Sequence, residues 1–127
     1  MTPGTEDSKR VLGSMGEDLA VSFLKGLRYR ILERNFRCKG GEIDIVAQDG
    51  TTLVFVEVKS RRTMVYGPPQ LAVTSFKQRQ ISKAALTWLA SRRRLDSGAR
   101  FDVVAITFQP TGEPYVEHFV NAFELNY

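Results

Sequence analysis

The chain has 127 residues, of which 43% are hydrophobic and 25% charged, and its formal net charge is +4. Its size and composition are those of one globular domain and exclude a disordered chain, and the small positive excess permits an anionic partner without requiring one. The single cysteine, Cys38, excludes an intrachain disulfide and a cysteine-based zinc site, and favours a cytoplasmic location. The longest apolar runs, 53–56 and 101–106, are too short to cross a bilayer, so no membrane contact is expected.

The chain is expected to begin with a flexible tail over residues 1–9, which are polar and small and contain no apolar targeting segment. A single domain is expected over residues 10–127. Its first element is an amphipathic helix, because apolar residues recur at three- and four-residue spacing from Leu12 to Leu27. Gly26 is the expected end of this helix.

Residues with high strand propensity predict three strands after this helix, separated by glycine-containing turns. A proline-containing loop over residues 61–70 precedes a second amphipathic helix over residues 73–94, and two further strands follow. This order of helix, three strands, helix and two strands predicts an α/β fold, in which a mixed sheet of about five strands has a helix on either face. The predicted strands cover residues 29–38, 42–48, 51–60, 100–108 and 115–120.

Charged residues interrupt the apolar pattern of the second and third predicted strands. Asp44 lies in the second, whereas Glu57 and Lys59 share one face of the third because they are two residues apart. A two-residue turn at Asp49-Gly50 would put Asp44 diagonal to Glu57, roughly 7 Å away between Cβ atoms, and a four-residue turn would put it directly opposite, at ~5 Å. Both registers place the carboxylates on one face, and a shift by a single residue would separate them.

Two carboxylates this close repel each other, and a divalent cation removes that cost. Oxygen ligands suit Mg²⁺ or Mn²⁺, which bind through one or two carboxylates together with water and substrate phosphate. Such an ion activates water and stabilises charge on a phosphate, while Lys59 would orient the water or neutralise the developing charge. The alternative is a solvated charge cluster in which Lys59 pairs with Glu57 or Glu42. The residue pattern divides evenly between these two interpretations.

The segments Gly41–Val46 and Phe55–Lys59 together resemble the acidic core of the PD-(D/E)XK nuclease superfamily. More closely, the chain resembles the bacterial YraN family of endonuclease-like proteins, which are similar to archaeal Holliday-junction resolvases. This resemblance extends from about Gly13 to Leu125 and includes Arg100–Val104. The leading proline of the superfamily motif is absent, since an isoleucine precedes the aspartate.

The resemblance implies a restriction-endonuclease-like core with a metal ion held by Asp44, Glu57 and the carbonyl of Val58. It also implies that Lys59 is catalytic and that Glu17, from the first helix, is an accessory acid. A solvated helix residue is an equally good interpretation of Glu17. Two weaker candidates for lining the site are Gln78 and Glu42.

Basic residues around the expected site would suit a phosphate backbone. Each of them, taken singly, is explained better by solvation of the surface. The candidates for nucleic-acid binding are Arg61, Arg62, Lys77, Arg79 and Lys39.

The preferred function is therefore metal-dependent hydrolysis of phosphodiester bonds in DNA, with branched or structured DNA as a candidate substrate. A rival interpretation is a non-catalytic nucleic-acid-binding module on the same fold, and a third is a structural protein in which the acids only make salt bridges. Nucleic acid, DNA before RNA, is the expected partner, and a homodimer is compatible with the sequence.

Four residues outside the site carry structural expectations. Trp88 and Phe76 are expected in the core, and His118 is expected at the surface. Asp102 is expected to pair with Arg100 or with an adjacent loop.

Overall fold

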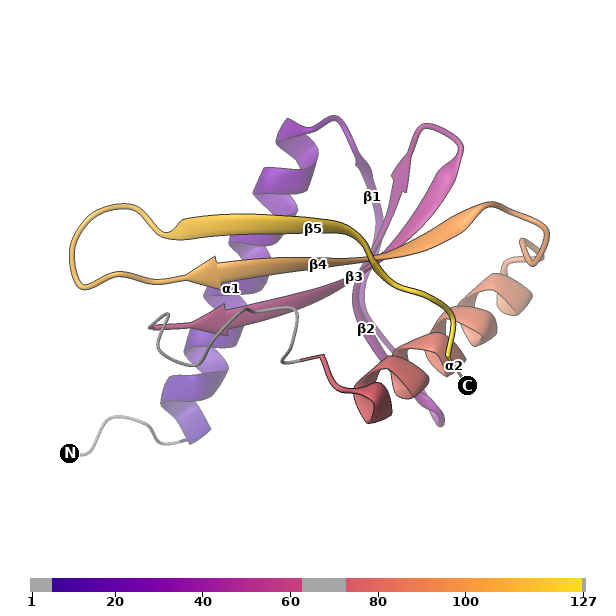
Figure 1. The fold of residues 1–127 in the computed structure, drawn as a ribbon, viewed down its shortest axis with the longest axis horizontal. Helices are drawn as coiled ribbons and strands as arrows, with labels where there is room; N and C mark the ends of the chain where they lie inside the picture. Colours follow the sequence, from indigo (N-terminus) through magenta and orange to yellow (C-terminus); the bar gives the residue numbers. More distant parts are fainter. Residues whose placement is uncertain (1–5, 63–72, 127) are drawn as a thin grey trace.

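A five-stranded sheet with a helix on each face forms the described part of the chain, residues 6–62 and 73–126 of the computed structural model (Figure 1). The elements follow the predicted order of helix, three strands, helix and two strands, which confirms the expected α/β class. Among the described helices, none is long and apolar enough to cross a membrane. The elements are α1 Glu6–Gly26, β1 Arg30–Cys38, β2 Gly41–Asp49, β3 Thr52–Arg61, α2 Ser75–Ser91, β4 Ala99–Thr107 and β5 Tyr115–Phe123.

The strands lie side by side in chain order, and the sheet is mixed. Strands β1, β2 and β3 are antiparallel, β3 and β4 are parallel, and β5 returns antiparallel to β4. A parallel pair needs a long connection, and α2 provides it between β3 and β4. Gln48 pairs with Leu53, as predicted for the longer connection between β2 and β3, but Asp49 also pairs with Thr52, so the turn itself is only two residues long.

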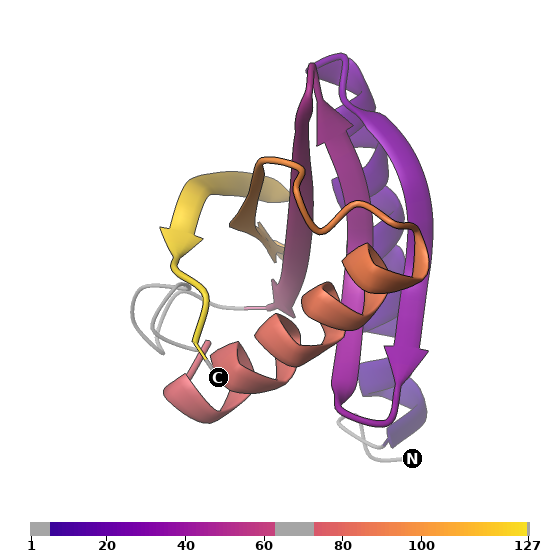
Figure 2. The same ribbon diagram turned by 90° about the vertical axis from the view of Figure 1, so that its right-hand side faces the viewer.

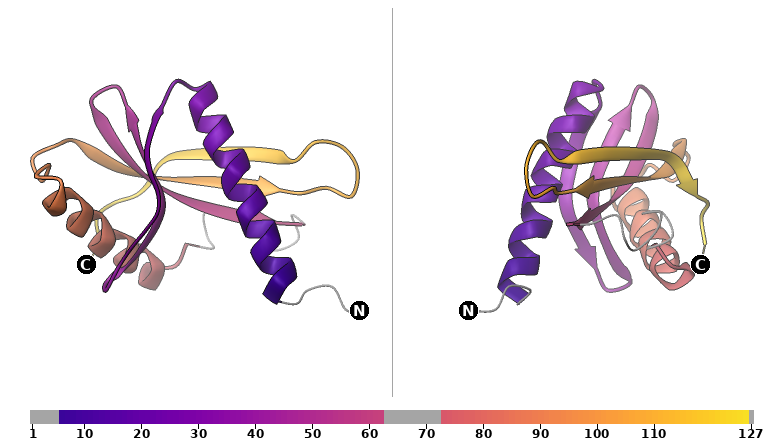
Figure 3. Two further views of the ribbon diagram at one scale, coloured as in Figure 1. Left: turned by 180° about the vertical axis from the view of Figure 1, so that it is seen from behind. Right: turned by 60° about the vertical axis from the view of Figure 1, so that its left-hand side comes forward.

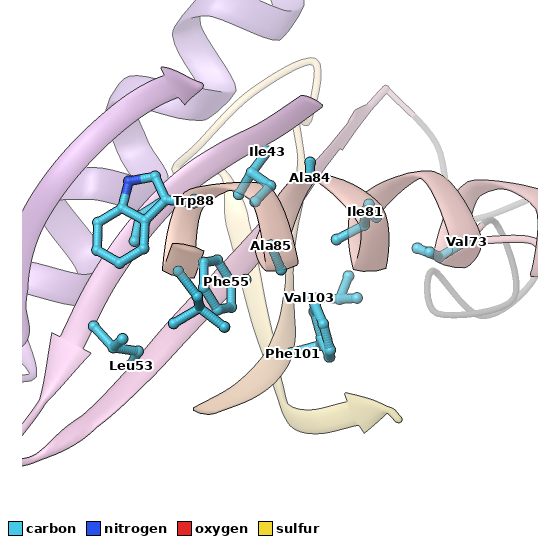
Figure 4. Close-up of a cluster of buried hydrophobic side chains, with 12 residues drawn as sticks. Ile43, Leu53, Phe55, Val73, Ile81, Ala84, Ala85, Trp88, Phe101 and Val103 are labelled. Carbon is cyan, nitrogen blue, oxygen red and sulfur yellow. The ribbon is translucent and has the colours of Figure 1, made fainter. Parts of the chain in front are cut away.

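Alternation along the strands gives the sheet two buried faces. One face packs against α1, where Ile45 and Val56 of the sheet share a core cluster with Leu24 of the helix. The other packs against α2, where Phe55 and Trp88 meet edge to face with ring centroids 5.9 Å apart (Figure 4). Figures 2 and 3 show the helices on opposite faces, with α1 crossing the sheet diagonally.

The helix boundaries differ from those predicted. Helix α1 begins at Glu6, inside the expected tail, and the rest of that tail, residues 1–5, lies outside the described residues. Most of the predicted loop, residues 63–70, also lies outside them. Helix α2 is shorter than predicted because Thr74 caps its N-terminus and the left-handed backbone of Arg93, with φ of 56°, prevents continuation.

Two burial predictions were wrong. Phe76 is 63% exposed, because it lies in the first turn of α2 and away from the buried stripe that contains Ile81 and Trp88. The side chain of His118 is only 9% exposed, since the rings of Phe23 and Tyr29 pack against it. The core position of Trp88 and the pairing of Asp102 with Arg100 are confirmed.

Helix α1 approaches β3 so closely at Gly16 that a Cβ atom there would collide with the side chain of Ser60. We therefore expect Gly16→Ala to lower the free energy of unfolding by about 1–3 kcal/mol, because the Ser60 hydroxyl must rotate away and its Cβ atom, 3.0 Å from the new methyl group, must also give way. Gly13, one turn earlier in the same helix, has nothing within 4 Å of such an atom. Gly13→Ala should instead stabilise by up to about 1 kcal/mol. Urea unfolding of both variants measures the difference, and equal effects would contradict the close approach.

Candidate active site at the fork of β2 and β3

The backbone ladder between β2 and β3 extends from the turn to the pair Ile45–Val56. Beyond this pair, the Oδ2 atom of Asp44 accepts a hydrogen bond from the backbone N–H of Val58 at 2.8 Å. A side-chain oxygen thus occupies the place of a backbone carbonyl, which separates the two strands. At the resulting fork, Asp44 is held in place by its hydrogen bond to the backbone of β3.

Asp44 faces the side of the sheet covered by α1, where it lines a pocket of about 470 Å³ together with Val58. Glu17 of α1 lines the same pocket, so the structure brings the predicted accessory acid together with two of the three predicted metal ligands, Asp44 and Val58. The Oε1 atom of Glu17 accepts hydrogen bonds from Arg34 Nε at 3.0 Å and Asn35 Nδ2 at 2.9 Å. The other lining residues are Lys9, Leu12, Gly13 and Ser60.

Glu57 continues the face of β3 that packs against α2, and its side chain is only 5% exposed. Its Oε2 atom lies 3.6 Å from Lys59 Nζ and 3.8 Å from Lys77 Nζ. Burial raises the pKa of the Glu57 carboxyl from 4.5 to about 8, with a further rise from the charge of Asp44 and a hydrogen bond to it, while both lysines act in the opposite direction. Near neutral pH the acid pair therefore retains a proton.

The two acids meet differently from the prediction. They were expected on one face of a regular hairpin, but Asp44 points toward the pocket beside α1, whereas Glu57 is contacted by Lys77 from α2. Their carboxyl groups still interact, because the open fork allows a hydrogen bond between them. Lys59 contacts Glu57, as the two-residue spacing predicted.

The acid pair fits a hard divalent cation. Burial and the charge of Asp44 both raise the pKa of the Glu57 carboxyl, and a cation between the two groups can relieve the same repulsion. Across residues 6–62 and 73–126, no three acidic, histidine or cysteine side chains gather closely enough to enclose a metal ion. The protein ligands would thus be Asp44, Glu57 and the Val58 carbonyl, with water and phosphate completing the shell, as Mg²⁺ commonly requires.

The raised pKa of Glu57 makes the metal-free protein sensitive to base. The folded state retains a proton that the unfolded chain gives up above its ordinary pKa of 4.5, so stability falls as pH rises from 4.5 through about 8. We expect a loss on the order of a few kcal/mol in urea unfolding with a chelator present. Glu57→Gln should abolish the fall, and Mg²⁺ should reduce it in the wild-type protein. A flat profile for wild type would contradict the protonated pair.

Two of the predicted basic residues, Lys39 and Lys77, line a second pocket of about 280 Å³ on the α2 side of the fork. Lys77 connects this pocket with the acids, because it also contacts Glu57. Glu42 lies at the same pocket and pairs with Arg37 at 3.3 Å. The pocket also contains Cys38, Gly40, Gly41 and Gln80.

The remaining predicted residues lie at the margin. Arg61 Nε donates to the hydroxyl of Thr107 at 3.2 Å, and Gln78 Nε2 donates to the carbonyl of Val73 at 3.0 Å. Arg62 and Arg79 are exposed.

Sequence reasoning assigned no role at the acids to Arg34 and Asn35, the two residues that hold Glu17. The only signal for them is an asparagine within a charged strand, which is a residue type that tolerates left-handed backbone.

The fold and the fork define an α/β protein in which two lysines contact the buried acid Glu57, and its neighbour Asp44 shares a pocket with a third acid, Glu17. Residues 16–106 match the model of the uncharacterised protein family UPF0102, and the chain belongs to that family. All three acids lie inside the matched segment. The family description names no reaction or partner, so the site carries the functional argument.

Relatives in this family share nearly the full length of the chain. The UPF0102 protein of Geobacter metallireducens is 71% identical over 117 residues, which cover 91% of this chain and 94% of the relative. That of Geobacter sulfurreducens is 66% identical over 118 residues, covering 93% and 92%. The UPF0102 protein of Anaeromyxobacter dehalogenans is 46% identical over 121 residues, covering 95% and 90%.

Proposed function

We propose that this protein is a metal-dependent nuclease that hydrolyses phosphodiester bonds in DNA, with branched or structured DNA as its preferred substrate. The observation that carries the proposal is the acid pair: Asp44 and Glu57 are held together at a strand fork at the cost of a raised pKa for Glu57. Enzymes place perturbed carboxyl groups where chemistry needs them. The resemblance of this segment to the PD-(D/E)XK motif gives independent support.

Each residue at the fork has a role in such a reaction. Mg²⁺ or Mn²⁺, held by Asp44, Glu57 and the Val58 carbonyl, would supply positive charge to the phosphate and an activated water. Lys59 lies 3.6 Å from Glu57 and is partly exposed, so its ammonium group can orient the attacking water and stabilise charge on the phosphate. Glu17 lines the pocket and can accept a proton or orient water from the α1 side.

The pocket on the α2 side supports a nucleic-acid partner. Among the described residues that line it are Arg37, Lys39 and Lys77, against one acid, Glu42, so their summed charge is positive. Lys77 lies 3.8 Å from Glu57, which places positive charge directly beside the acids. A phosphate backbone that occupied this pocket would thus bring a neighbouring phosphodiester to the fork.

The test combines cleavage with binding. Wild-type protein should cleave branched DNA in Mg²⁺ or Mn²⁺ and not in chelator, and its affinity for DNA should fall as salt rises. Lys39→Gln should weaken binding and reduce the slope of log affinity against log salt by about 1. Lys25→Gln, in the last turn of α1, is the matched control and should change neither. Binding that does not depend on salt would contradict the phosphate contact.

A non-catalytic nucleic-acid-binding module is the second candidate. The observation that favours it is that two lysines contact Glu57, so the acid has countercharges of its own. Salt-sensitive binding of DNA without cleavage of any branched or linear substrate, in Mg²⁺ or Mn²⁺, would support the module and exclude the nuclease.

A further inference from the structure

Asn35 has an unusual conformation for a residue in the middle of an edge strand. Its φ of 54° lies in the left-handed region, which residues with a Cβ atom seldom adopt and asparagine tolerates best apart from glycine. Its neighbours in β1 pair regularly, Arg34 with Ile45 and Phe36 with Ile43. Asn35 therefore lies opposite Asp44, the acid at the fork.

The left-handed backbone of Asn35 interrupts the regular alternation of β1 side chains between the two faces of the sheet. Glu33 accepts a hydrogen bond from Trp88 of α2, and Phe36 packs in the cluster beneath the same helix. Between them, Arg34 and Asn35 both contact Glu17 of α1. Regular strands place successive side chains on opposite faces, so this break delivers two donors in succession to one carboxylate.

Both donors bind the same oxygen of Glu17. Arg34 Nε lies 3.0 Å from Oε1 and Asn35 Nδ2 lies 2.9 Å from it, and Arg34 is itself fixed by Asp18 at 2.7 Å. This arrangement fixes one oxygen of the carboxylate in the pocket that Glu17 shares with Asp44. Asn35 is exposed, so burial of its side chain does not explain the conformation.

We propose that Asn35 is a positioning residue, which through its side-chain amide holds Glu17 in the pocket beside Asp44, where the Glu17 carboxylate would contact water bound to the metal ion. The inference rests on the proposed function, because it assigns Glu17 a role beside the metal ion that Asp44 and Glu57 are proposed to hold. Residues that do not bind a metal ion themselves but orient the groups around it typically change its affinity by 10–100-fold when they are replaced.

Substitution of Asn35 by glycine separates the contribution of its side-chain amide from that of its left-handed backbone. Asn35→Gly keeps the left-handed conformation without strain and removes only the hydrogen bond to Glu17. Asn121→Gly is the matched control, since Asn121 in β5 has a φ of 53° and its backbone N–H, which bonds Asp102, is retained. Melting temperatures of both variants establish that the fold is intact.

Mn²⁺ affinity is then measured by calorimetry on the full-length protein for wild type, Asn35→Gly, Glu17→Gln and the double variant. Each single variant should bind Mn²⁺ about tenfold more weakly, and the double variant no more weakly than Glu17→Gln alone, because Asn35 acts through Glu17. In metal-free protein, the NMR signals of the Asn35 side-chain amide should shift on Glu17→Gln. Asn121→Gly should bind like wild type.

The proposal is overturned if Asn35→Gly binds Mn²⁺ like wild type, or if the double variant loses the product of the two single effects. A different experimental outcome would show that only the proposed nuclease function is wrong. In that case wild type binds Mn²⁺ with this dependence on Asn35 and cleaves no DNA, and the positioning of Glu17 stands.

Discussion

Asp44→Asn protein is expected to lose DNA cleavage by at least roughly a hundredfold while unfolding at the wild-type temperature or above it. The asparagine Oδ1 atom can still accept the hydrogen bond that Asp44 Oδ2 takes from Val58 N–H, so the fork is preserved. The substitution removes one negative charge that raises the pKa of Glu57 and so relieves repulsion in the metal-free protein. The negative charge that would hold a divalent cation is lost.

The measurement pairs Mg²⁺-dependent cleavage of branched and linear DNA with thermal unfolding in chelator. Asp96→Asn makes the same chemical change at an exposed loop position and should alter neither result. Lys59→Ala should reduce cleavage as well, since its ammonium group lies at the acid pair. A marked loss of stability in Asp44→Asn, with no cleavage by wild type, would favour a purely structural salt-bridge cluster.

Local pattern was sufficient to predict most of the fold. The spacing of apolar residues located both helices, and the turn residues located the strands in their correct order. The two-residue spacing of Glu57 and Lys59 put them in contact. These features depend on residues that are close in the sequence, and the residue repeat of a helix or a strand determines how such residues are arranged.

What could not be predicted depends on contacts between distant segments. The fork arises because the Asp44 carboxylate replaces a backbone partner of β3, and no periodicity encodes such an exchange. Lys77 reaches Glu57 from α2, through the packing of that helix on the sheet. The left-handed backbone of Asn35 changes the alternation of β1, which a pattern of apolar and polar residues treats as regular.

A second large effect is expected away from the fork, at Asp102. Its side chain is fully buried, and it accepts hydrogen bonds from Arg100 Nε at 3.0 Å and the Asn121 backbone N–H at 2.9 Å; His118 Nε2 lies 2.8 Å away. We expect Asp102→Asn to lower the free energy of unfolding by about 3–5 kcal/mol, because it removes the buried one of the two carboxylates that pair with the largely buried guanidinium of Arg100. Urea unfolding near neutral pH measures the loss.

Asp49→Asn is the matched control for this substitution. Asp49 binds the same guanidinium, at 3.1 Å from Arg100 Nη1, but its side chain is 45% exposed. Water can replace its carboxylate, so the expected loss is less than about 1 kcal/mol. Equal losses for the two variants would show that burial of Asp102 contributes nothing beyond an ordinary ion pair.

The pH dependence of the same comparison provides the sharper test. Burial alone would raise the pKa of Asp102, but hydrogen bonds from His118, Arg100 and the Asn121 N–H, with the charge of Arg100, outweigh burial and hold it below its ordinary 3.8. A carboxyl group whose pKa is lowered on folding stabilises the native state above its ordinary pKa, and this contribution disappears as pH falls through the lower, folded value. The gap in unfolding free energy between wild type and Asp102→Asn should therefore narrow as pH falls below 3.8. A gap that stays constant into acid would mean that the loss comes from packing around the amide and not from the buried charge.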